Sequence, residues 1–437
     1  MVSKPANQMQ AAFVEQVSEE KLLDCMRCGF CLPACPTYIQ SGYNEVHSPR
    51  GRIAIMKGIR DGIVEWDSST EEAIDLCLGC RACEPVCPAG VEYGHLLEQT
   101  RAAVQSAKST SLKEQVSRKV AFDHLFKNQS AMVGATKLVR AYQASGLQKT
   151  VRKIGFMELF PPMLKEMEKA MPVVPKQTKR KPLVRVNKPT MNIAFFSGCL
   201  MDTMFRKTND HTIQLLEMLG CNIVIPEAQV CCGALHGHSG ELEKAKWNAR
   251  RNIDAFDLSE IDFIVNNAGG CGAFLAEYGH LLAEDKEYAE RAKVYDGKII
   301  DVSSLLVKLG ISEKLKAVSH LRNDLITYQD SCHLRNVNRV VNEPREILSS
   351  IPSAQYIELP SAGLCCGSAG IYNLLNQEMS LRILDDKMRD VQQTNASIVI
   401  TTNPGCLLQM RAGIQRAGMS DIVRAEHIVD YLIEVLI

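Results

Sequence analysis

Two short stretches decide the fold of this chain: residues 25–36, CMRCGFCLPACP, and residues 77–88, CLGCRACEPVCP. Each contains four cysteines with two, two and three residues between them, and each ends in Cys-Pro. Three closely spaced thiols can surround one part of an inorganic group, but a fourth ligand must then come from elsewhere. The spacing therefore predicts that the two stretches fold together into one small N-terminal module.

The double pattern is typical of proteins that bind two 4Fe–4S clusters, in which each fourth cysteine binds the other cluster. One predicted ligand set is Cys25, Cys28, Cys31 and Cys87. The other is Cys77, Cys80, Cys83 and Cys35. Four-cysteine zinc sites usually consist of separate cysteine pairs. Disulfides need an oxidising compartment, and the polar N-terminus does not resemble a signal peptide. We therefore expect two 4Fe–4S clusters.

The composition limits the class of protein further. The chain has 437 residues, with 50 basic and 50 acidic side chains, so no overall charge indicates a nucleic-acid partner. The chain has 17 cysteines. In a reducing compartment, cysteines more often serve metal binding or catalysis than a structural role. No stretch has the length and apolar character of a membrane span. We expect a cytoplasmic protein whose contact with a membrane, if any, is peripheral and at the inner face.

Four regions follow along the chain. Residues 1–105 are predicted to form the two-cluster domain, and residues 106–190 a helical segment with a basic, proline-rich linker. The linker composition predicts an extended, solvated tether, with a docking strip for an acidic partner or a membrane face as the alternative. Residues 191–315 and 316–437 are predicted to form two further domains that are copies of one another.

The evidence for the copies is a set of cysteine landmarks at a nearly constant offset. Cys199 and Cys332 are 133 residues apart, the Cys-Cys-Gly motifs at 231–233 and 365–367 are 134 apart, and Cys271 and Cys406 are 135 apart. Short apolar strands alternate with helical patterns between these landmarks, which predicts α/β units with parallel strands. Sites in such sheets form at the carboxyl ends of the strands, where we expect the outer cysteines to lie. The predicted fold class is therefore α/β and α+β multidomain, with an N-terminal helical two-cluster module of the ferredoxin type followed by two pseudo-symmetric, cysteine-rich α/β domains.

Each copy offers four thiols to a further metal centre. The first set is Cys199, Cys231, Cys232 and Cys271, and the second set is Cys332, Cys365, Cys366 and Cys406. Four thiolates suit either an iron–sulfur cluster or a structural zinc ion, and the sequence leaves both open. The glycine after each pair permits close approach of the backbone to a bulky cofactor. Cys221 lies outside these motifs and is interpreted as a small buried apolar residue.

Several polar residues accompany the cysteines. His236, His238 and His333 have four possible roles: metal ligands, proton donors, hydrogen-bond donors that tune a cluster, or histidines that are satisfied within the fold, which the lack of a partner motif favours. Arg50 and Arg52 either raise the potential of a cluster or pair with local acids. The sequence contains no nucleotide-binding fingerprint and no catalytic triad, so we predict no catalytic residue and no flavin or nicotinamide site.

Taken together, these motifs resemble the iron–sulfur subunit family of bacterial glycolate oxidase over residues 20–437. The segments that carry the resemblance include both quartets, the intervening SPRGRI and both Cys-Cys-Gly motifs. They are residues 25–38, 48–53, 77–91, 231–241, 266–279, 328–334, 365–373 and 402–406.

The resemblance implies a division of labour. FAD-containing subunits would remove two electrons from glycolate to give glyoxylate, and this chain would pass them singly toward a quinone or another acceptor. The isolated chain would then be inactive on glycolate.

Three alternatives remain open. One is an iron–sulfur subunit of a flavin-dependent glycerol-3-phosphate or lactate dehydrogenase. Another is a redox catalyst that is similar to heterodisulfide reductase. A third is a zinc-stapled scaffold that docks a flavoprotein. Heterodisulfide reductase modules end in C-x-x-C, and here Phe274 and Gln409 replace the final cysteine, which argues against the second alternative.

Overall fold

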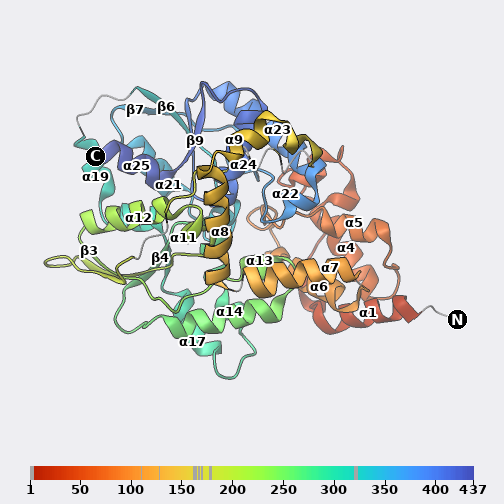
Figure 1. The fold of residues 1–437 in the computed structure, drawn as a ribbon. Coiled ribbons are helices and arrows are strands. Elements are labelled where there is room, and N and C mark those ends of the chain that lie inside the picture. The colour runs from red at the N-terminus through yellow and green to blue at the C-terminus, as the bar shows by residue number, and fades with distance from the viewer. Residues whose placement is uncertain are drawn as a thin grey trace.

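The computed structural model describes residues 4–109, 111–126, 128–160, 165, 168, 171–176, 180–318 and 323–437. A helical N-terminal module lies beside two α/β repeats, and further helices connect them (Figure 1). The predicted fold class, a helical module followed by two α/β domains, is confirmed.

The N-terminal module is a set of short helices around one hydrophobic core. Its helix α4 begins after Ser48, whose Oγ accepts a hydrogen bond from the Gly51 amide, and Pro49 occupies the first helical position. Phe13, Met56 and Leu96 are completely buried where α1, α4 and α6 meet. The elements are α1 (Lys4–Gln16), α2 (Glu19–Leu23), α3 (Pro36–Gln40), η1 (Glu45–His47), α4 (Pro49–Arg60), α5 (Ser68–Asp75) and α6 (Tyr93–Ala107).

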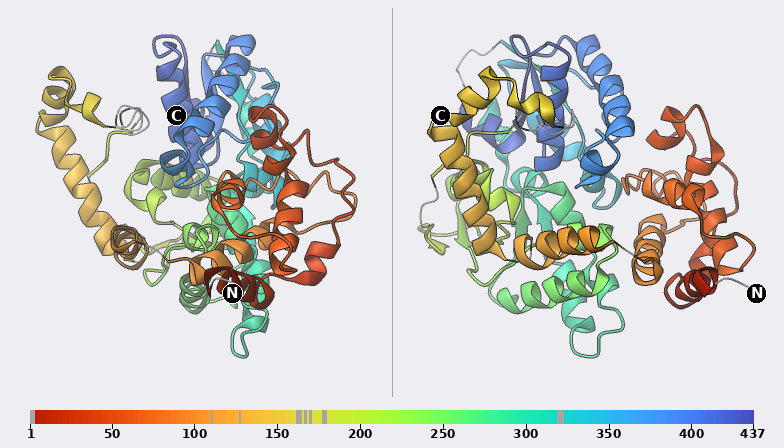
Figure 2. Two further views of the ribbon diagram at one scale, coloured as in Figure 1. Left: turned by 90° about the vertical axis from the view of Figure 1, so that its right-hand side faces the viewer. Right: turned by 45° about the vertical axis from the view of Figure 1, so that its right-hand side comes forward.

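The connecting region is helical, as predicted, and runs along the outside of the molecule (Figure 2). Its described elements are α7 (Leu112–Arg118), η2 (Lys119–Leu125), α8 (Gln129–Ala144), α9 (Leu147–Lys153) and η3 (Phe156–Leu159). The basic linker contains one feature that its composition did not reveal. Strand β1 (Leu183–Val184) pairs antiparallel with β3 and becomes the edge strand of the first sheet.

The two repeats contain the same parallel sheet. The first has the order β1-β3-β2-β4-β5 and the second β7-β6-β8-β9, so that all pairs except β1·β3 are parallel. Without β1, the two orders are identical, and the predicted internal repeat is confirmed. The strands are β2 (Met191–Phe195), β3 (Cys221–Val224), β4 (Phe263–Asn266), β5 (Ile299–Asp301), β6 (Asp324–Tyr328), β7 (Ala354–Tyr356), β8 (Ile398–Thr401) and β9 (Arg424–His427).

The repeats exchange equivalent helix contacts. Helix α12 (Arg206–Met218) of the first repeat packs against α25 (Ile428–Leu436) of the second, and α21 (Asn342–Ser349) of the second packs against α18 (Val302–Lys308) of the first. One hydrophobic cluster contains buried residues from both sheets. Cys221 is completely buried in it, as predicted. The two repeats therefore form one body with approximate two-fold symmetry.

The other helices of the repeats surround these sheets. They are α11 (Leu200–Thr203), α13 (Ala234–His238), α14 (Leu242–Ala255), α15 (Gly269–Leu275), α16 (Tyr278–Leu281), α17 (Ala289–Asp296), α19 (Ile311–Lys316), α20 (Cys332–Asn336), α22 (Tyr372–Leu375), α23 (Gln377–Thr394) and α24 (Pro404–Arg416).

The outer cysteines of each repeat lie at the beginnings of helices and not at the last residues of strands. Cys199 precedes α11 and Cys332 is the first residue of α20, while Cys271 and Cys406 lie in the first turns of α15 and α24. The strands end several residues earlier, so each cysteine follows its strand through a short loop. The loops after β4 and β8 meet, because the Gly269 amide donates to the Thr402 carbonyl at 3.1 Å.

Candidate metal-cluster sites

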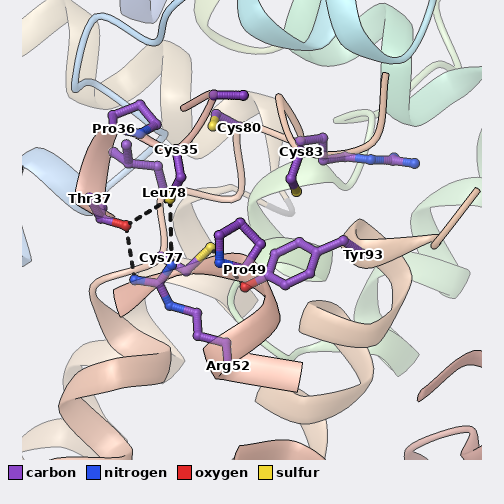
Figure 3. Close-up of a pocket in the computed structure, with 12 residues that line it drawn as sticks. Cys35, Pro36, Thr37, Pro49, Arg52, Cys77, Leu78, Cys80, Cys83 and Tyr93 are labelled. Carbon is purple, nitrogen blue, oxygen red and sulfur yellow. Dashed lines mark hydrogen bonds between the residues drawn. The ribbon is translucent and has the colours of Figure 1, made fainter. Parts of the chain in front are cut away.

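Four cysteines from the two N-terminal quartets line one cavity (Figure 3). Cys35 reaches the cavity from the first quartet, and Cys77, Cys80 and Cys83 reach it from the loop after α5. We call these four residues the inner site. The structure thus brings together the crossed set that the sequence predicted. Four thiols around one cavity are the donor set that a 4Fe–4S cluster uses, so the residues present fit this group.

The two quartet loops have the same backbone conformation. Arg27 and Gly29 have φ angles of 56° and 91°, and Gly79 and Arg81, at the same two positions of the second quartet, have 62° and 58°. Left-handed residues in such loops turn successive N–H groups toward one side, a backbone shape found at many iron–sulfur sites. The conformation is uncommon for a residue with a side chain, so its occurrence at both arginines shows that the loop shape is imposed by the module.

A buried arginine lies against the inner site. The side chain of Arg52 is completely buried. Its Nε donates to the Ala73 carbonyl at 2.5 Å. Its Nη2 donates to Thr37 Oγ1 at 3.0 Å, and its Nη1 lies 4.0 Å from Cys35 Sγ (Figure 3). The wall of the inner site therefore contains a positive charge as well as thiols.

The inner thiols differ in their electrostatic surroundings. Burial raises the pKa of the Cys80 and Cys83 thiols well above the usual value. Burial acts in the same direction on Cys77, but the charges of Arg52 and Arg101 outweigh it and lower the pKa of that thiol. Tyr93 also contributes, because its hydroxyl donates to Cys77 Sγ at 3.4 Å. The sequence analysis missed Tyr93, which has no recognisable motif and reaches the site from α6.

The other predicted set lies nearer the surface, and we call it the outer site: Cys25, Cys28, Cys31 and Cys87. Cys28 is exposed, and the other three are half-buried against the core of the N-terminal module. Burial raises the pKa of Cys31 to about 11. The two sites of the module therefore differ mainly in their access to solvent.

Each repeat brings its four thiols into a row. Cys199 and Cys231 are in contact, with their sulfurs 3.7 Å apart, and the contacts continue through Cys232 to Cys271. The second repeat has the same order of contacts, which runs through Cys332, Cys365, Cys366 and Cys406.

The geometry of these rows bears on the choice between zinc and a cluster. Zinc holds four sulfurs at about 2.3 Å in a tetrahedron. No group of three or more cysteine, histidine or acidic side chains converges in this way among the described residues. Tetrahedral coordination at this bond length places neighbouring sulfurs about 3.8 Å apart, so the 3.7 Å contact between Cys199 and Cys231 suits a zinc ion as well as a cluster, and the structure leaves both open.

The glycine of each Cys-Cys-Gly motif is explained by packing against a helix. Gly233 and Gly367 have φ angles of 92° and 89°, which residues with side chains rarely adopt. A Cβ atom at Gly367 would lie 2.8 Å from the Ser380 carbonyl oxygen in α23, and at Gly233 it would lie 3.4 Å from Ala245 in α14. At both glycines the backbone closely approaches a helix of the same repeat, and the predicted approach to a cofactor stays a prediction.

The two repeats differ at buried positions that face their thiols. The buried faces of α14 and α23 correspond, so that Asn252 in the first repeat is equivalent to Lys387 in the second. Asn252 donates to the Cys231 carbonyl at 3.1 Å, whereas the Lys387 amine donates to Ser361 Oγ at 2.8 Å and lies near the second cysteine set. The second repeat therefore holds a buried amine where the first holds a neutral amide.

The predicted histidines fall into two groups. His236 Nε2 lies 3.0 Å from the Phe122 carbonyl and His238 Nδ1 lies 2.8 Å from Glu98, so both are satisfied within the fold. His333 is in contact with Cys332, at 3.5 Å between Nδ1 and Sγ. Its other ring nitrogen is buried without a hydrogen-bond partner among the described residues.

The inner site lies directly against the second repeat. Leu78 packs in one hydrophobic cluster with Cys365 and Tyr372, and Cys80 and Cys332 lie at the margin of this cluster. The side-chain amide of Asn336 donates to the Cys80 carbonyl at 2.9 Å. The second cysteine set is therefore adjacent to the inner site of the N-terminal module.

Family models match most of the chain. Residues 21–91 match a 4Fe–4S dicluster domain, residues 193–276 and 326–411 match a cysteine-rich domain, and residues 113–171 match the linker region of glycolate oxidase iron–sulfur subunits. The N-terminal module is thus a two-cluster 4Fe–4S domain. No helix of the described residues has the length and hydropathy that a membrane crossing requires.

Individual relatives agree with the family models. A probable glycolate oxidase iron–sulfur subunit of Bacillus subtilis is 52% identical over 99% of this chain and 98% of its own length. The glycolate oxidase iron–sulfur subunit of Escherichia coli is 30% identical over 94% of both chains. Lactate utilization protein A of Bacillus subtilis is 31% identical over 55% of this chain and 99% of its own length.

Proposed function

This chain belongs to the family of glycolate oxidase iron–sulfur subunits, and we propose that it passes single electrons from FAD-containing subunits toward a quinone or another acceptor. In this proposal the flavin subunits oxidise glycolate to glyoxylate. Iron–sulfur clusters accept and release one electron at a time, which lets this chain divide the electron pair that a flavin delivers. The observation that carries the proposal is the inner site, where four cysteines from two distant quartets line one cavity.

We propose crossed ligation in the N-terminal module. The inner cluster would be held by Cys35, Cys77, Cys80 and Cys83. The outer cluster would be held by Cys25, Cys28, Cys31 and Cys87. Three of the four inner cysteines are buried, Cys80 is half-buried and Cys28 of the outer set is exposed, which supports two clusters in unlike surroundings.

Two serine variants test this assignment. Cys35→Ser should damage the cluster that is held mainly by the second quartet, and Cys28→Ser, its matched control within the first quartet, should damage only the other cluster. Electron paramagnetic resonance (EPR) of the reduced full chain separates the two outcomes. If Cys35→Ser and Cys28→Ser perturb the same signal, the crossed assignment is wrong.

We further propose that at least one cysteine set of the repeats holds an additional metal centre. The contacts within each set support a shared centre, and four thiolates suit either an iron–sulfur cluster or a zinc ion. Iron, sulfide and zinc should be measured on anaerobically purified full chain. A content of about eight irons and no zinc per chain, as two 4Fe–4S clusters require, would contradict the proposal.

A further inference from the structure

Arg52 is a buried cation whose hydrogen bonds go to no acidic side chain. They go to the Ala73 carbonyl, to the Thr37 hydroxyl and toward Cys35 Sγ. Within the part of the chain that the structure describes, Arg52 makes no ion pair with a carboxylate. A buried charge without a counter-charge is strongly destabilising. The Cys35 sulfur, 4.0 Å from Nη1, and the Cys77 thiol of the same cavity are the groups that can supply negative charge beside it.

Arg50 is the natural comparison, because it lies two residues earlier on the same helix. Its guanidinium is paired with the Glu45 carboxylate at 2.6 and 3.0 Å and donates to the Arg27 carbonyl at 2.9 Å. The pair is partly exposed. A carboxylate therefore neutralises this charge, and solvent screens it. Helix α4 thus carries two arginines near the quartets, and among the described residues Arg52 is the one that has no carboxylate partner.

We propose that Arg52 is the fixed positive charge that raises the reduction potential of the inner cluster above that of the outer cluster. The inference rests on the crossed ligation proposed above. It identifies Arg52 as a residue that sets the direction of electron transfer and does not react itself.

The physical reason is the charge that reduction adds. One-electron reduction places one more negative charge among the inner thiolates, with no bond formed and no proton required. Burial alone disfavours that additional charge and would give the buried site the lower potential. The potentials of such clusters depend on net charge, hydrogen bonds and solvent exposure. The Arg52 guanidinium lies in the same low-dielectric environment and attracts the additional negative charge, so it raises the reduction potential that burial would lower.

The position of the inner site indicates what a higher potential at the inner cluster would achieve. An electron that enters at the exposed outer site would be drawn toward the inner site. There, Cys80 lies close enough to Cys332 and Cys365 for their charges to interact. Arg52 would therefore favour movement of the electron from the surface toward the second repeat.

The test is a redox titration of the full chain, followed by EPR, for wild type, Arg52→Gln, Arg52→Lys and Arg50→Gln. Arg52→Gln should lower the equilibrium constant for reduction of the inner cluster at least tenfold, or about 59 mV for a one-electron couple, and leave the outer cluster unchanged. Arg52→Lys keeps the charge and should retain most of the wild-type potential. Arg50→Gln should shift neither cluster by this amount.

The proposal is overturned if Arg52→Gln leaves the inner potential unchanged, or if Arg50→Gln shifts it equally. If the Arg52→Gln variant does not assemble the inner cluster, the order of the two potentials is measured in the wild-type chain. The Cys28→Ser variant then identifies which EPR signal belongs to the outer cluster. The inner cluster must then be reduced first, and earlier reduction of the outer cluster refutes the proposal. Failure here would leave the proposed electron-transfer role intact, because that role depends on the clusters and not on their order.

Discussion

The two cysteine-rich repeats share one sheet order and one row of four thiols, yet they meet the N-terminal module in different ways. The first repeat meets it through charge, since Arg81 pairs with Glu277 at 2.6 Å. The second repeat meets it through an apolar contact that contains Leu78, Tyr372 and Ile383. Duplication has therefore preserved the fold, while the surroundings of the thiols have diverged. Cysteines of the second repeat, Cys332 and Cys365, lie beside Leu78 and Cys80 of the inner-site loop.

The largest effect should come from removing the apolar contact. Tyr372 is 6% exposed, and its hydroxyl donates to the Leu76 carbonyl at 3.1 Å. Tyr372→Ala should cost about 3 kcal/mol or more, because a large buried side chain is lost. Tyr372→Phe removes only the hydrogen bond and should cost about 1 kcal/mol. Thermal unfolding of the full chain measures both, and equal melting temperatures for the two variants would contradict this view of the contact.

The two Cys-Cys-Gly motifs should respond unequally to alanine. In Gly367→Ala the new Cβ meets a backbone carbonyl, whereas in Gly233→Ala its nearest neighbour, at 3.2 Å, is the Phe274 ring. A side chain can yield more easily than backbone. We expect losses of about 3 kcal/mol for Gly367→Ala and about 1 to 2 kcal/mol for Gly233→Ala. Urea unfolding followed by circular dichroism tests the order, and a larger loss at Gly233 would contradict the packing argument.

The charged contact of the first repeat should be weaker and dependent on pH. Burial raises the pKa of Glu277, but His95 and Arg81 outweigh burial and lower it to about 2. Since an ordinary glutamate has a pKa of about 4.3, this carboxylate stabilises the fold fully above about pH 4.5. Its contribution disappears as the pH falls toward 2. Glu277→Gln should cost about 2 kcal/mol at pH 7, with the partial exposure of the pair taken into account.

The control for this pair is Glu290→Gln, which removes an exposed carboxylate that pairs with Lys293. Its melting temperature should match that of wild type. A difference between wild type and Glu277→Gln that persists unchanged from pH 7 to pH 3 would show that the charge of Glu277 is not the source of the stability.

The smallest effect on stability should come from Lys387→Met. The amine is buried with Ser361 as its hydrogen-bond partner, so an apolar side chain of similar length should change the stability by less than about 1 kcal/mol. Loss of the positive charge near Cys365 and Cys366 should instead weaken metal retention in the second repeat. Iron per chain after dialysis against a chelator measures this, with Lys387→Arg as the control. Equal retention in Lys387→Met and wild type would contradict the role of the charge.

Much of the architecture was predictable because it is repeated in the sequence. The constant offsets between Cys199 and Cys332, and between Cys271 and Cys406, correctly indicated two copies of one α/β fold. The quartet spacing indicated which four cysteines would gather at the inner site, and Cys35 does join Cys77 there. These features can be recognised in the sequence because they depend on the spacing of cysteines along the chain.

What could not be predicted depends on contacts between distant segments. Arg50 and Arg52 look alike in sequence, and only packing buries one of them and pairs the other with Glu45. Lys387 and Asn252 have no motif, and their equivalence becomes visible only when the two helices are compared. Strand β1 has two residues, too few to show a period.

The most direct test of the electron-transfer role is to add glycolate anaerobically to the full chain, with and without its flavin subunits, and to follow cluster reduction by EPR. We predict no reduction by glycolate when the chain is alone, because the proposed clusters would carry single electrons and the sequence has no flavin fingerprint. We predict reduction of the inner cluster when the flavin subunits are present. Glycolate oxidation by the purified chain alone, with clusters intact and no flavin bound, would contradict the account.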